Sequence, residues 1–219
     1  MCSEKSFQGV KCSRCTRELV PEEVFVKDPP MCMQCARVAM EDIIEKHCLA
    51  SDLTDPMEMA KEIVSDKRIA VHGPHHHFLV PAVLLSAYCN KKGLKEEKEG
   101  MIRTARERAS HILGGFCGTH GDCGTAVGIG ISVSIITGAT PLSEDVWDLG
   151  IIATAQALMR IGKTCTGPRC CKRNMFIAIE EATEFFKENL DISLDTSPAG
   201  KCPFVDANEE CIYEKCPFI

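Results

Sequence analysis

The sequence lacks the features of two common classes of protein. Its 219 residues include 25 Lys or Arg and 31 Asp or Glu, which gives a net charge of −6. No overall positive field attracts phosphate backbones, so we expect no nucleic-acid partner. The first residues, Met1 to Glu4, do not begin a basic-then-apolar leader, which predicts a cytoplasmic protein rather than a secreted one.

A membrane span is a third class that the sequence does not support. Residues 124–143 are uncharged, over about the length that crosses a bilayer. The stretch contains several Gly, Ser and Thr residues and Pro141, and it lacks the Lys, Arg or aromatic anchors that flank a span. We therefore expect a buried helix here and no membrane partner.

Cysteine, in contrast, is abundant: the chain has 15 Cys but only one Trp and two Tyr. In a reducing cytosol, clustered thiols more often bind metals or do chemistry than form disulfides. The composition, 45% hydrophobic and 26% charged, is typical of a globular protein. The sequence therefore predicts a globular metalloprotein, of a kind that suits an anaerobe.

The strongest motif is a pair of C-x2-C steps separated by sixteen residues. This spacing is typical of a four-thiolate zinc site, and residues 18–27 between the steps can form a short hairpin. Rubredoxin-like iron is the alternative, but Thr16 and Ala36 stand where rubredoxin knuckles usually have Gly, so zinc is favoured. The predicted ligands are Cys12, Cys15, Cys32 and Cys35.

Beyond this motif, apolar residues recur with helical periodicity, and there is neither a repeat nor a βαβ alternation. The fold class is therefore predicted to be mainly α. A helical bundle domain at residues 51–195 is expected to follow a zinc-ribbon module with a docking helix at 1–50. Residues 196–219 are expected to form a cysteine-rich, metal-ligating tail.

Start and stop signals place the helices of the bundle. One helix is expected to begin at Ser143 and to bury its larger apolar side chains, Ile151, Ile152, Ala155, Leu158 and Met159. The other helices are expected at 56–66, 78–88, 94–113, 124–143 and 174–190.

The Gly-rich loop before residue 124 contains two candidate catalytic thiols, Cys117 and Cys123. A helix that starts here would favour their thiolate forms. Gly124, Gly128 and Gly130 in the same helix predict the close approach of another backbone or of a ligand. Inert thiols in a loop ahead of a small-residue helix contact are the alternative.

A cluster of cations near a helix start suggests an anion-binding site. Arg169, Lys172 and Arg173 oppose the helix dipole, so a substrate carboxylate, a phosphate or a thiolate-bound cluster nearby would explain them. We expect Arg169 and Arg173 to bind substrate. Three solvated side chains on a surface turn are the alternative.

A histidine-rich segment precedes the helix expected at 78–88. Its side chains could ligate a metal or transfer protons, and a polar capping loop is the alternative. We predict a catalytic role for His76 and substrate binding by His72.

The tail adds Cys202, Cys211 and Cys216, two of which precede proline, as in ferredoxin ligand sequences. A tail this short and polar has no core of its own, so we expect a metal centre to hold it in place. The predicted centre is a 4Fe–4S cluster, with a second zinc ion as the alternative. The fourth thiol is left open among Cys117, Cys123, Cys170 and Cys171; Cys170 is included in the predicted set.

Three of these segments, residues 72–85, 117–143 and 167–179, resemble an uncharacterised family of cysteine-rich proteins from anaerobic bacteria and archaea. The shared stretches read HGPxHHFLVPAVLL, GIxVSIITGATPLS and GPRCCKRN. Some members are fused to S-adenosylmethionine-dependent methyltransferase domains, which implies a neighbourhood of methyl-group or cofactor metabolism. This chain has no glycine-rich nucleotide fingerprint, and we assign it no methyltransferase chemistry.

Together these features predict a zinc- and iron–sulfur-binding protein that performs redox or sulfur-transfer chemistry on a small anionic molecule or cofactor. The alternative is a non-catalytic adaptor, or a metal-delivery protein, for a partner enzyme such as a methyltransferase. The sequence does not decide whether the protein is an enzyme, and it gives no reaction, cluster type or oligomeric state.

Overall fold

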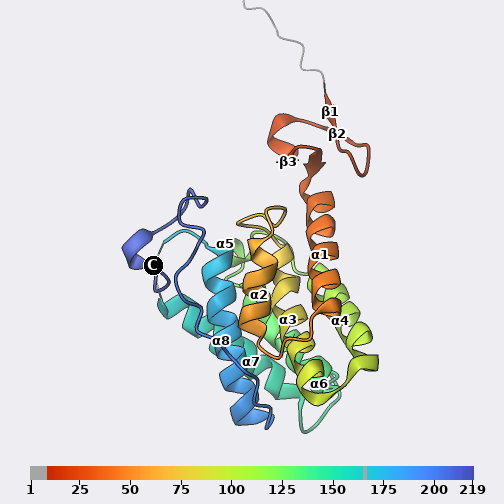
Figure 1. Ribbon diagram of the computed structural model, residues 1–219, viewed down its shortest axis with the longest axis vertical. Helices are drawn as coiled ribbons and strands as arrows, with labels where there is room; N and C mark the ends of the chain where they lie inside the picture. Colours follow the sequence, from red (N-terminus) through yellow and green to blue (C-terminus); the bar gives the residue numbers. More distant parts are fainter. Residues whose placement is uncertain (1–8, 165–166) are drawn as a thin grey trace, which may run out of the picture.

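The structure is a computed structural model that describes residues 9–164 and 167–219, and its helices pack around a central helix, α3 (Figure 1). Helix α3 contacts α1, α2, α4, α6 and α8, and its Leu79 and Leu84 are completely buried. The predicted mainly α fold class is confirmed. The helices are α1 Met33–Ala50, α2 Pro56–Ser65, α3 His75–Lys92, α4 Lys95–Ser110, α5 Phe116–Thr119, α6 Gly124–Thr137, α7 Trp147–Thr164 and α8 Cys171–Asn189.

Two small antiparallel sheets precede the bundle. Strand β1 (Val10–Lys11) pairs with β2 (Glu18–Leu19), and β3 (Val24–Lys27) pairs with β4 (Pro30–Cys32). The single hairpin expected over residues 18–27 is therefore wrong. Strand β3 turns back onto β4 through residues 28–29 alone, which keeps the entropy cost of loop closure small. Strand β2 pairs with β1 instead of β3, across residues 12–17. Short 3₁₀ turns lie at Pro21–Glu23 and Tyr213–Lys215.

Helix α1 connects these sheets to the bundle. The two sheets and the four cysteines near them, residues 9–35, are called the ribbon below. The ribbon lies at the end of α1 that projects from the bundle (Figure 1). Farther along α1, buried Arg37 pairs with Glu41 at 2.6 Å and donates hydrogen bonds to the carbonyls of Ala109 and Ile112 at the end of α4. Helix α1 thus contributes to both parts, and a domain boundary at residue 50 stays a prediction.

Glycines bring α6 into close contact with its neighbours. A Cβ at Gly128 would lie 2.7 Å from Cδ of Pro81 in α3, and one at Gly130 would lie 2.8 Å from the carbonyl oxygen of Gly150 in α7. The predicted close approach is confirmed, and helix packing accounts for it at both positions. The helix ends at Thr137, earlier than expected, and within the described residues no helix has the length and hydropathy of a membrane span.

Helix α7 differs most from its prediction. It begins at Trp147, because the Ser143 hydroxyl accepts a hydrogen bond from the Thr140 backbone in a preceding turn instead of capping the helix. Its buried residues are Ala153 and Ala157, and the predicted burial of the larger side chains is wrong. Only small residues fit where two helix backbones touch, so Ile151, Ile152 and Met159 are exposed and Leu158 is half-buried. Ala155, also predicted to be buried, is exposed as well.

Two other helices begin three residues before their predicted starts, α3 at His75 and α8 at Cys171. Pro81 therefore lies in the second turn of α3 rather than in the first.

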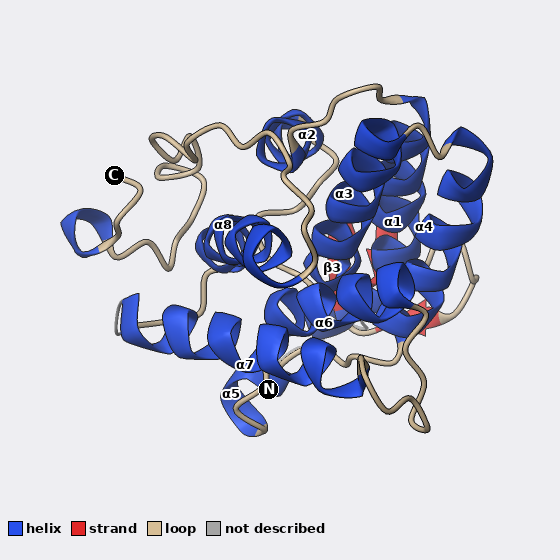
Figure 2. Cartoon of the chain, turned by 90° about the horizontal axis from the view of Figure 1, so that it is seen from below, coloured by secondary structure: helices blue, strands red, loops and turns tan. Residues whose placement is uncertain are grey.

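The C-terminal segment runs back along the bundle on the side of α2 and α8 (Figure 2). Asp55, the N-cap of α2, accepts a hydrogen bond from the backbone of Ser197 at 2.6 Å. Farther on, the Phe218 ring packs edge-on against Phe176 of α8, with ring centres 5.3 Å apart. The tail thus lies against the start of α8.

Candidate functional site

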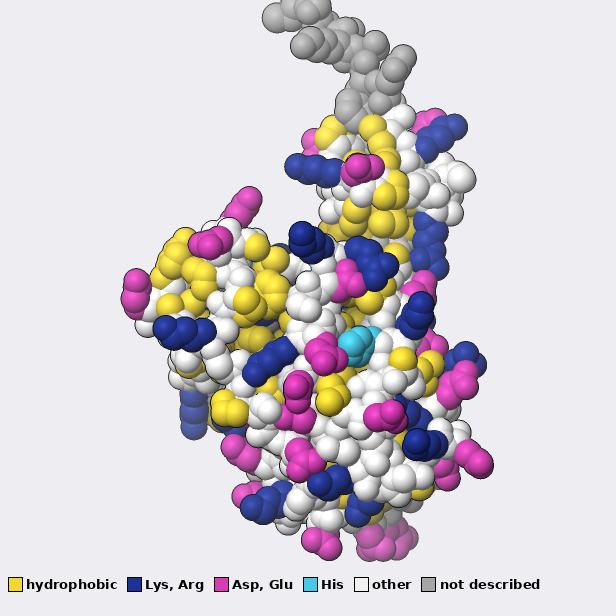
Figure 3. All heavy atoms as spheres, in the orientation of Figure 1, with side chains coloured by type: hydrophobic (Ala, Val, Ile, Leu, Met, Phe, Trp, Pro, Cys, Tyr) yellow, Lys and Arg dark blue, Asp and Glu magenta, His cyan; other side chains and the backbone are white. Residues whose placement is uncertain are grey.

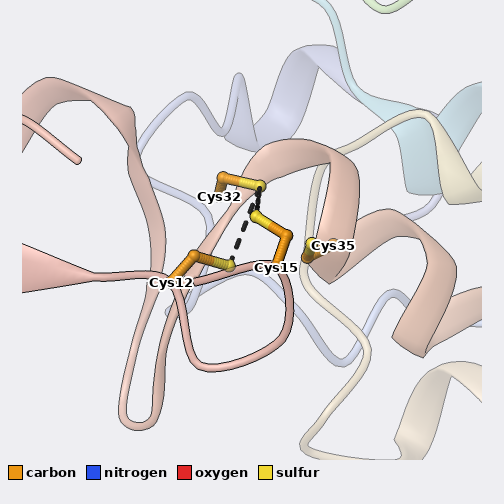
Figure 4. A group of neighbouring side chains, drawn as sticks. All are labelled: Cys12, Cys15, Cys32 and Cys35. Carbon is orange, nitrogen blue, oxygen red and sulfur yellow. Dashed lines mark hydrogen bonds between the residues drawn. The ribbon is translucent and has the colours of Figure 1, made fainter. Parts of the chain in front are cut away.

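The ribbon brings four cysteine sulfurs to one point (Figure 4). The sulfur of Cys32 lies 3.9 Å from that of Cys12 and 4.0 Å from that of Cys15. All four sulfurs, including that of Cys35, lie within 4.8 Å of one another. Zinc with four Zn–S bonds of about 2.3 Å requires sulfurs about 3.8 Å apart, so this group could hold a metal ion.

Local structure places these thiols and sets their ionisation. Cys12 follows β1, Cys32 is the N-cap of α1, and Cys35 lies in the first turn of that helix. Backbone N–H groups of Cys15 and Cys32 lower the pKa of Cys12 to about 6. Burial and the neighbouring sulfurs raise the pKa of Cys35 to about 12. A bound cation would favour the thiolate of all four.

A second cysteine group lies at the other end of the sequence. Cys170, the N-cap of α8, and three tail cysteines surround an enclosed cavity of about 20 Å³, closed by Phe176, Phe204 and Phe218. The four predicted cluster ligands are thus brought together, with Cys170 as the fourth thiol; Cys117, Cys123 and Cys171 do not line this cavity. The tail members are Cys202, Cys211 and Cys216.

Backbone N–H groups point at the sulfurs of this second group. Those of Arg173 and Tyr213 lie 3.5 Å from the sulfurs of Cys170 and Cys211, respectively. Burial raises the pKa of Cys202, and the Phe204 N–H opposes this rise. Within residues 9–164 and 167–219, the ribbon four are the one set of three or more potential ligands within 4.8 Å of one another, so the second group is spread more widely.

Lys172 is a functional candidate to which the sequence analysis gave no role of its own. Its side chain is fully buried, and no acceptor among the described residues pairs with its Nζ. The ammonium lies 4.7 Å from the centre of the Phe204 ring. Burial lowers the pKa of Lys172 to about 8, and the nearby thiols of Cys170 and Cys202 oppose this shift. The run of basic residues after residue 168 is the sequence feature that could have indicated Lys172.

A larger cavity of about 680 Å³ lies beside the second group. Its lining includes Cys117, Cys123, Arg169 and Arg173. The side chain of Arg173 lines both cavities, which places them next to each other. Two predicted catalytic thiols and two predicted substrate-binding arginines therefore share one cavity.

The environments of these residues differ. Cys117 is exposed, whereas half-buried Cys123 lies 3.4 Å from the amide nitrogen of Asn174 and 3.1 Å from the hydroxyl of Thr125. Arg169 forms an ion pair with Glu210 at 3.2 Å. The cation at this position is therefore balanced by a tail carboxylate.

The two predicted histidines lie apart from this lining. His72 connects α8 with the tail, because its Nε2 lies 2.8 Å from Oδ1 of Asn208 and its Nδ1 accepts a bond from the backbone of Cys171. His76 is fully buried, its Nδ1 bonds to the Gly73 carbonyl at 3.1 Å, and burial lowers its pKa well below the ordinary value. Neither histidine lines the two cavities, and their roles stay predictions.

The fold and its sites define a cysteine-rich helical-bundle protein with a ribbon that could bind a metal. The chain belongs to the family of unknown function DUF5714, which matches residues 44–219. Searches of curated proteins and of solved structures found no match. The ribbon cysteines precede the matched region, whereas the second cysteine group and the 680 Å³ cavity lie within it.

Proposed function

We propose that the protein holds a zinc ion in the ribbon and a 4Fe–4S cluster in the second cysteine group, and that it performs redox chemistry on a small anionic molecule in the neighbouring cavity. One observation carries the proposal. Four thiols from two distant segments surround an enclosed cavity, beside the buried ammonium of Lys172 that lacks a partner among the described residues. A thiolate-held cluster would supply the missing negative charge.

The donor sets support a different metal for each site. The ribbon sulfurs have the separation that a single tetrahedral ion needs, and Thr16 and Ala36 follow its two knuckles, which favours zinc over rubredoxin-like iron. The second group is more widely spread, as expected where each thiolate binds a different iron atom. Its N–H···S contacts are also typical of cluster ligands.

Each of the two cavities has its own role in the proposed chemistry: the small cavity holds the cluster, and the larger cavity holds the anion. Four thiols suffice to ligate every iron, which favours electron transfer over Lewis-acid catalysis at an open iron. A bound cluster would supply one-electron transfer, with an external one-electron reductant as the donor. Arg173 lies between the cavities, and Cys117 and Cys123 provide thiols for sulfur transfer. Arg173 would orient the anion, whereas Arg169 is already paired with Glu210.

Anaerobic purification followed by metal and acid-labile sulfide analysis tests the proposal. We expect about one zinc, four iron and four sulfide per chain, with a brown colour that oxygen bleaches. Cys211→Ser should lose iron and sulfide but retain zinc, and Cys32→Ser should do the reverse. Colourless protein that contains only zinc after anaerobic reconstitution would overturn the cluster.

A second candidate function is that of a non-catalytic adaptor or metal-delivery protein. Apolar side chains gather on the face of the ribbon seen in Figure 3. Among the ribbon residues, Val20 and Met33 are 51% and 53% exposed. Such a surface would suit a partner enzyme, and the resemblance to chains fused to methyltransferases suggests the kind of enzyme. Rapid loss of the ribbon metal to an apo-zinc acceptor would favour delivery, whereas retention would favour a resident ion.

A further inference from the structure

The 680 Å³ cavity has the size of a small-molecule site. Its lining includes five glycines from three segments, Gly115, Gly118, Gly121, Gly162 and Gly167. A Cβ added at any of the first four would meet no atom within 4 Å. Gly115, Gly121 and Gly167 have positive φ, a conformation that favours glycine. At Gly118 and Gly162 neither backbone strain nor close packing accounts for the glycine, and the space beside them is open.

Arg173 contributes a buried cation to this cavity. Its side chain is 7% exposed, and its Nη2 donates to the carbonyl of Pro168 at 3.1 Å. No carboxylate in the described parts of the chain lies within ion-pair distance of it. Arg169 differs, since Glu210 neutralises it at the surface. A buried guanidinium needs an anion, and its planar fork suits a carboxylate or a phosphate.

Asn174 adds an unsatisfied acceptor. The residue is 7% exposed and lines the cavity, and its Nδ2 lies 3.4 Å from the sulfur of Cys123. Its Oδ1 is buried without a donor among residues 9–164 and 167–219. Buried amide oxygens are normally hydrogen-bonded, so a ligand that donates a hydrogen bond would complete this group.

Cys123 lies beside these two side chains. It is the N-cap of the fourteen-residue helix α6. The Asn174 amide and the Thr125 hydroxyl can both donate to its sulfur. The cavity thus combines a cation, an acceptor and a sulfur nucleophile that is positioned by hydrogen bonds.

We propose that this cavity binds a small organic oxyanion that also carries a hydrogen-bond donor. Its carboxylate or phosphate pairs with Arg173, its donor reaches Oδ1 of Asn174, and its reactive atom lies against the sulfur of Cys123. The inference deepens the proposed function, on which it rests for the neighbouring redox centre, whereas the anion site itself requires no cluster.

Selective alkylation tests the site in the intact, anaerobically purified protein. The Cys123 thiolate displaces iodide from iodoacetate or from iodoacetamide, forming a carbon–sulfur bond and releasing the iodide ion. Iodoacetate is an anion and iodoacetamide is neutral, so an anion site should favour the first reagent at this residue. The measured quantity is the ratio of the two rate constants at Cys123, determined by peptide mass spectrometry.

We expect this ratio to be at least tenfold higher in the folded protein than in the same chain unfolded in urea. Arg173→Gln should remove the preference, and Arg173→Lys should retain part of it. The matched control, Arg169→Gln, should change the ratio less than twofold, because Glu210 already neutralises that charge. Inorganic phosphate or malonate should protect Cys123, and the stronger competitor identifies the acid group.

The outcomes separate this inference from the proposed function. Iron and sulfide are measured in the same samples. A high ratio in protein that contains only zinc supports the anion site and refutes the cluster. A ratio equal to that of the unfolded chain, in protein with a full cluster, overturns the anion site and leaves the cluster as the partner of Arg173. If Arg173→Gln does not fold, Asn174→Asp serves as the test. Its added carboxylate repels the iodoacetate anion, so the ratio of the iodoacetate to the iodoacetamide rate constant at Cys123 must fall.

Discussion

The ammonium of Lys172 faces the ring of Phe204, 4.7 Å from its centre, in a pocket that excludes water. A cation–π contact offsets only part of the cost of burying this charge. Lys172→Met is therefore expected to stabilise the metal-free protein by about 1–3 kcal/mol, as measured by urea unfolding.

In protein that carries the proposed cluster, the same substitution should disfavour reduction of the cluster. Removal of a positive charge beside the proposed cluster disfavours its reduced form, so the midpoint potential should fall by about 60 mV, equivalent to a tenfold change for one electron. Exposed Lys187 on the same helix provides the control, and Lys187→Met should change neither quantity. An unchanged potential in Lys172→Met would exclude the lysine as the counter-ion.

Cys32→Ser should release the ribbon metal and unfold the residues before α1. The ribbon has a small core of its own around Leu19, too small to fold without the metal. Helix α1 should persist, because Arg37 and Met40 are buried against the bundle. Hydrogen exchange read by mass spectrometry checks this boundary, with exposed Cys117→Ser as the control. Loss of protection throughout α1 would contradict the prediction.

Gly130→Ala should destabilise the contact between α6 and α7. The added methyl group would lie 2.3 Å from the Thr154 hydroxyl and 2.8 Å from the Gly150 carbonyl oxygen, so the helices must separate at a cost of about 1–3 kcal/mol. Gly100→Ala in α4 is the matched control, because its Cβ meets nothing within 4 Å. That change should stabilise the protein by about 0.5–1 kcal/mol. Urea unfolding of both variants measures the difference.

Acid should destabilise the bundle through three adjacent histidines of α3. Burial lowers the pKa of His75 to about 3, that of His77 to about 4, and that of His76 well below its ordinary value. Below pH 6.5 the unfolded chain binds protons that the folded chain does not, so stability is complete above that pH and falls below it.

Each histidine should contribute a slope that rises toward a limit of about 1.4 kcal/mol per pH unit near pH 5, or about 4 kcal/mol per pH unit for all three. His77→Gln should remove about one third of this slope, and substitution of exposed His111 should leave it unchanged. Urea unfolding at pH 7, 6 and 5 gives the slopes, and equal slopes for His77→Gln and the unaltered chain would refute the assignment.

The parts of this structure that depend on local spacing could be predicted from the sequence. The ribbon cysteines required only two C-x2-C steps, and Asp55 before Pro56 marked the start of α2. The burial of α7 could not be predicted in this way. Its apolar residues repeat with helical period on one side, yet Ala153 and Ala157 are the buried ones, since the distance to α6 decides what fits.

The second cysteine group illustrates the same limit. Its tail members were visible as a short run of thiols, and the sequence included Cys170 in the predicted set while leaving three other thiols open as the fourth; in the fold, Cys170 is the one that lines the cavity with them. The basic run marked Lys172 only as one of three cations, and nothing marked Asn174, because the cost of a buried polar atom appears only when its surroundings are known.

The three tail cysteines follow every helix of the bundle in the order of synthesis. On the ribosome, α8 and Cys170 are complete before Cys202 emerges, so the bundle can fold while the wall of its small cavity is still missing. Closure then depends on the last contacts to be made, those of Phe218 with Phe176 and with the backbone of Cys202. A chain that lacks the residues from Cys211 onward would therefore fold into a bundle whose small cavity stays open.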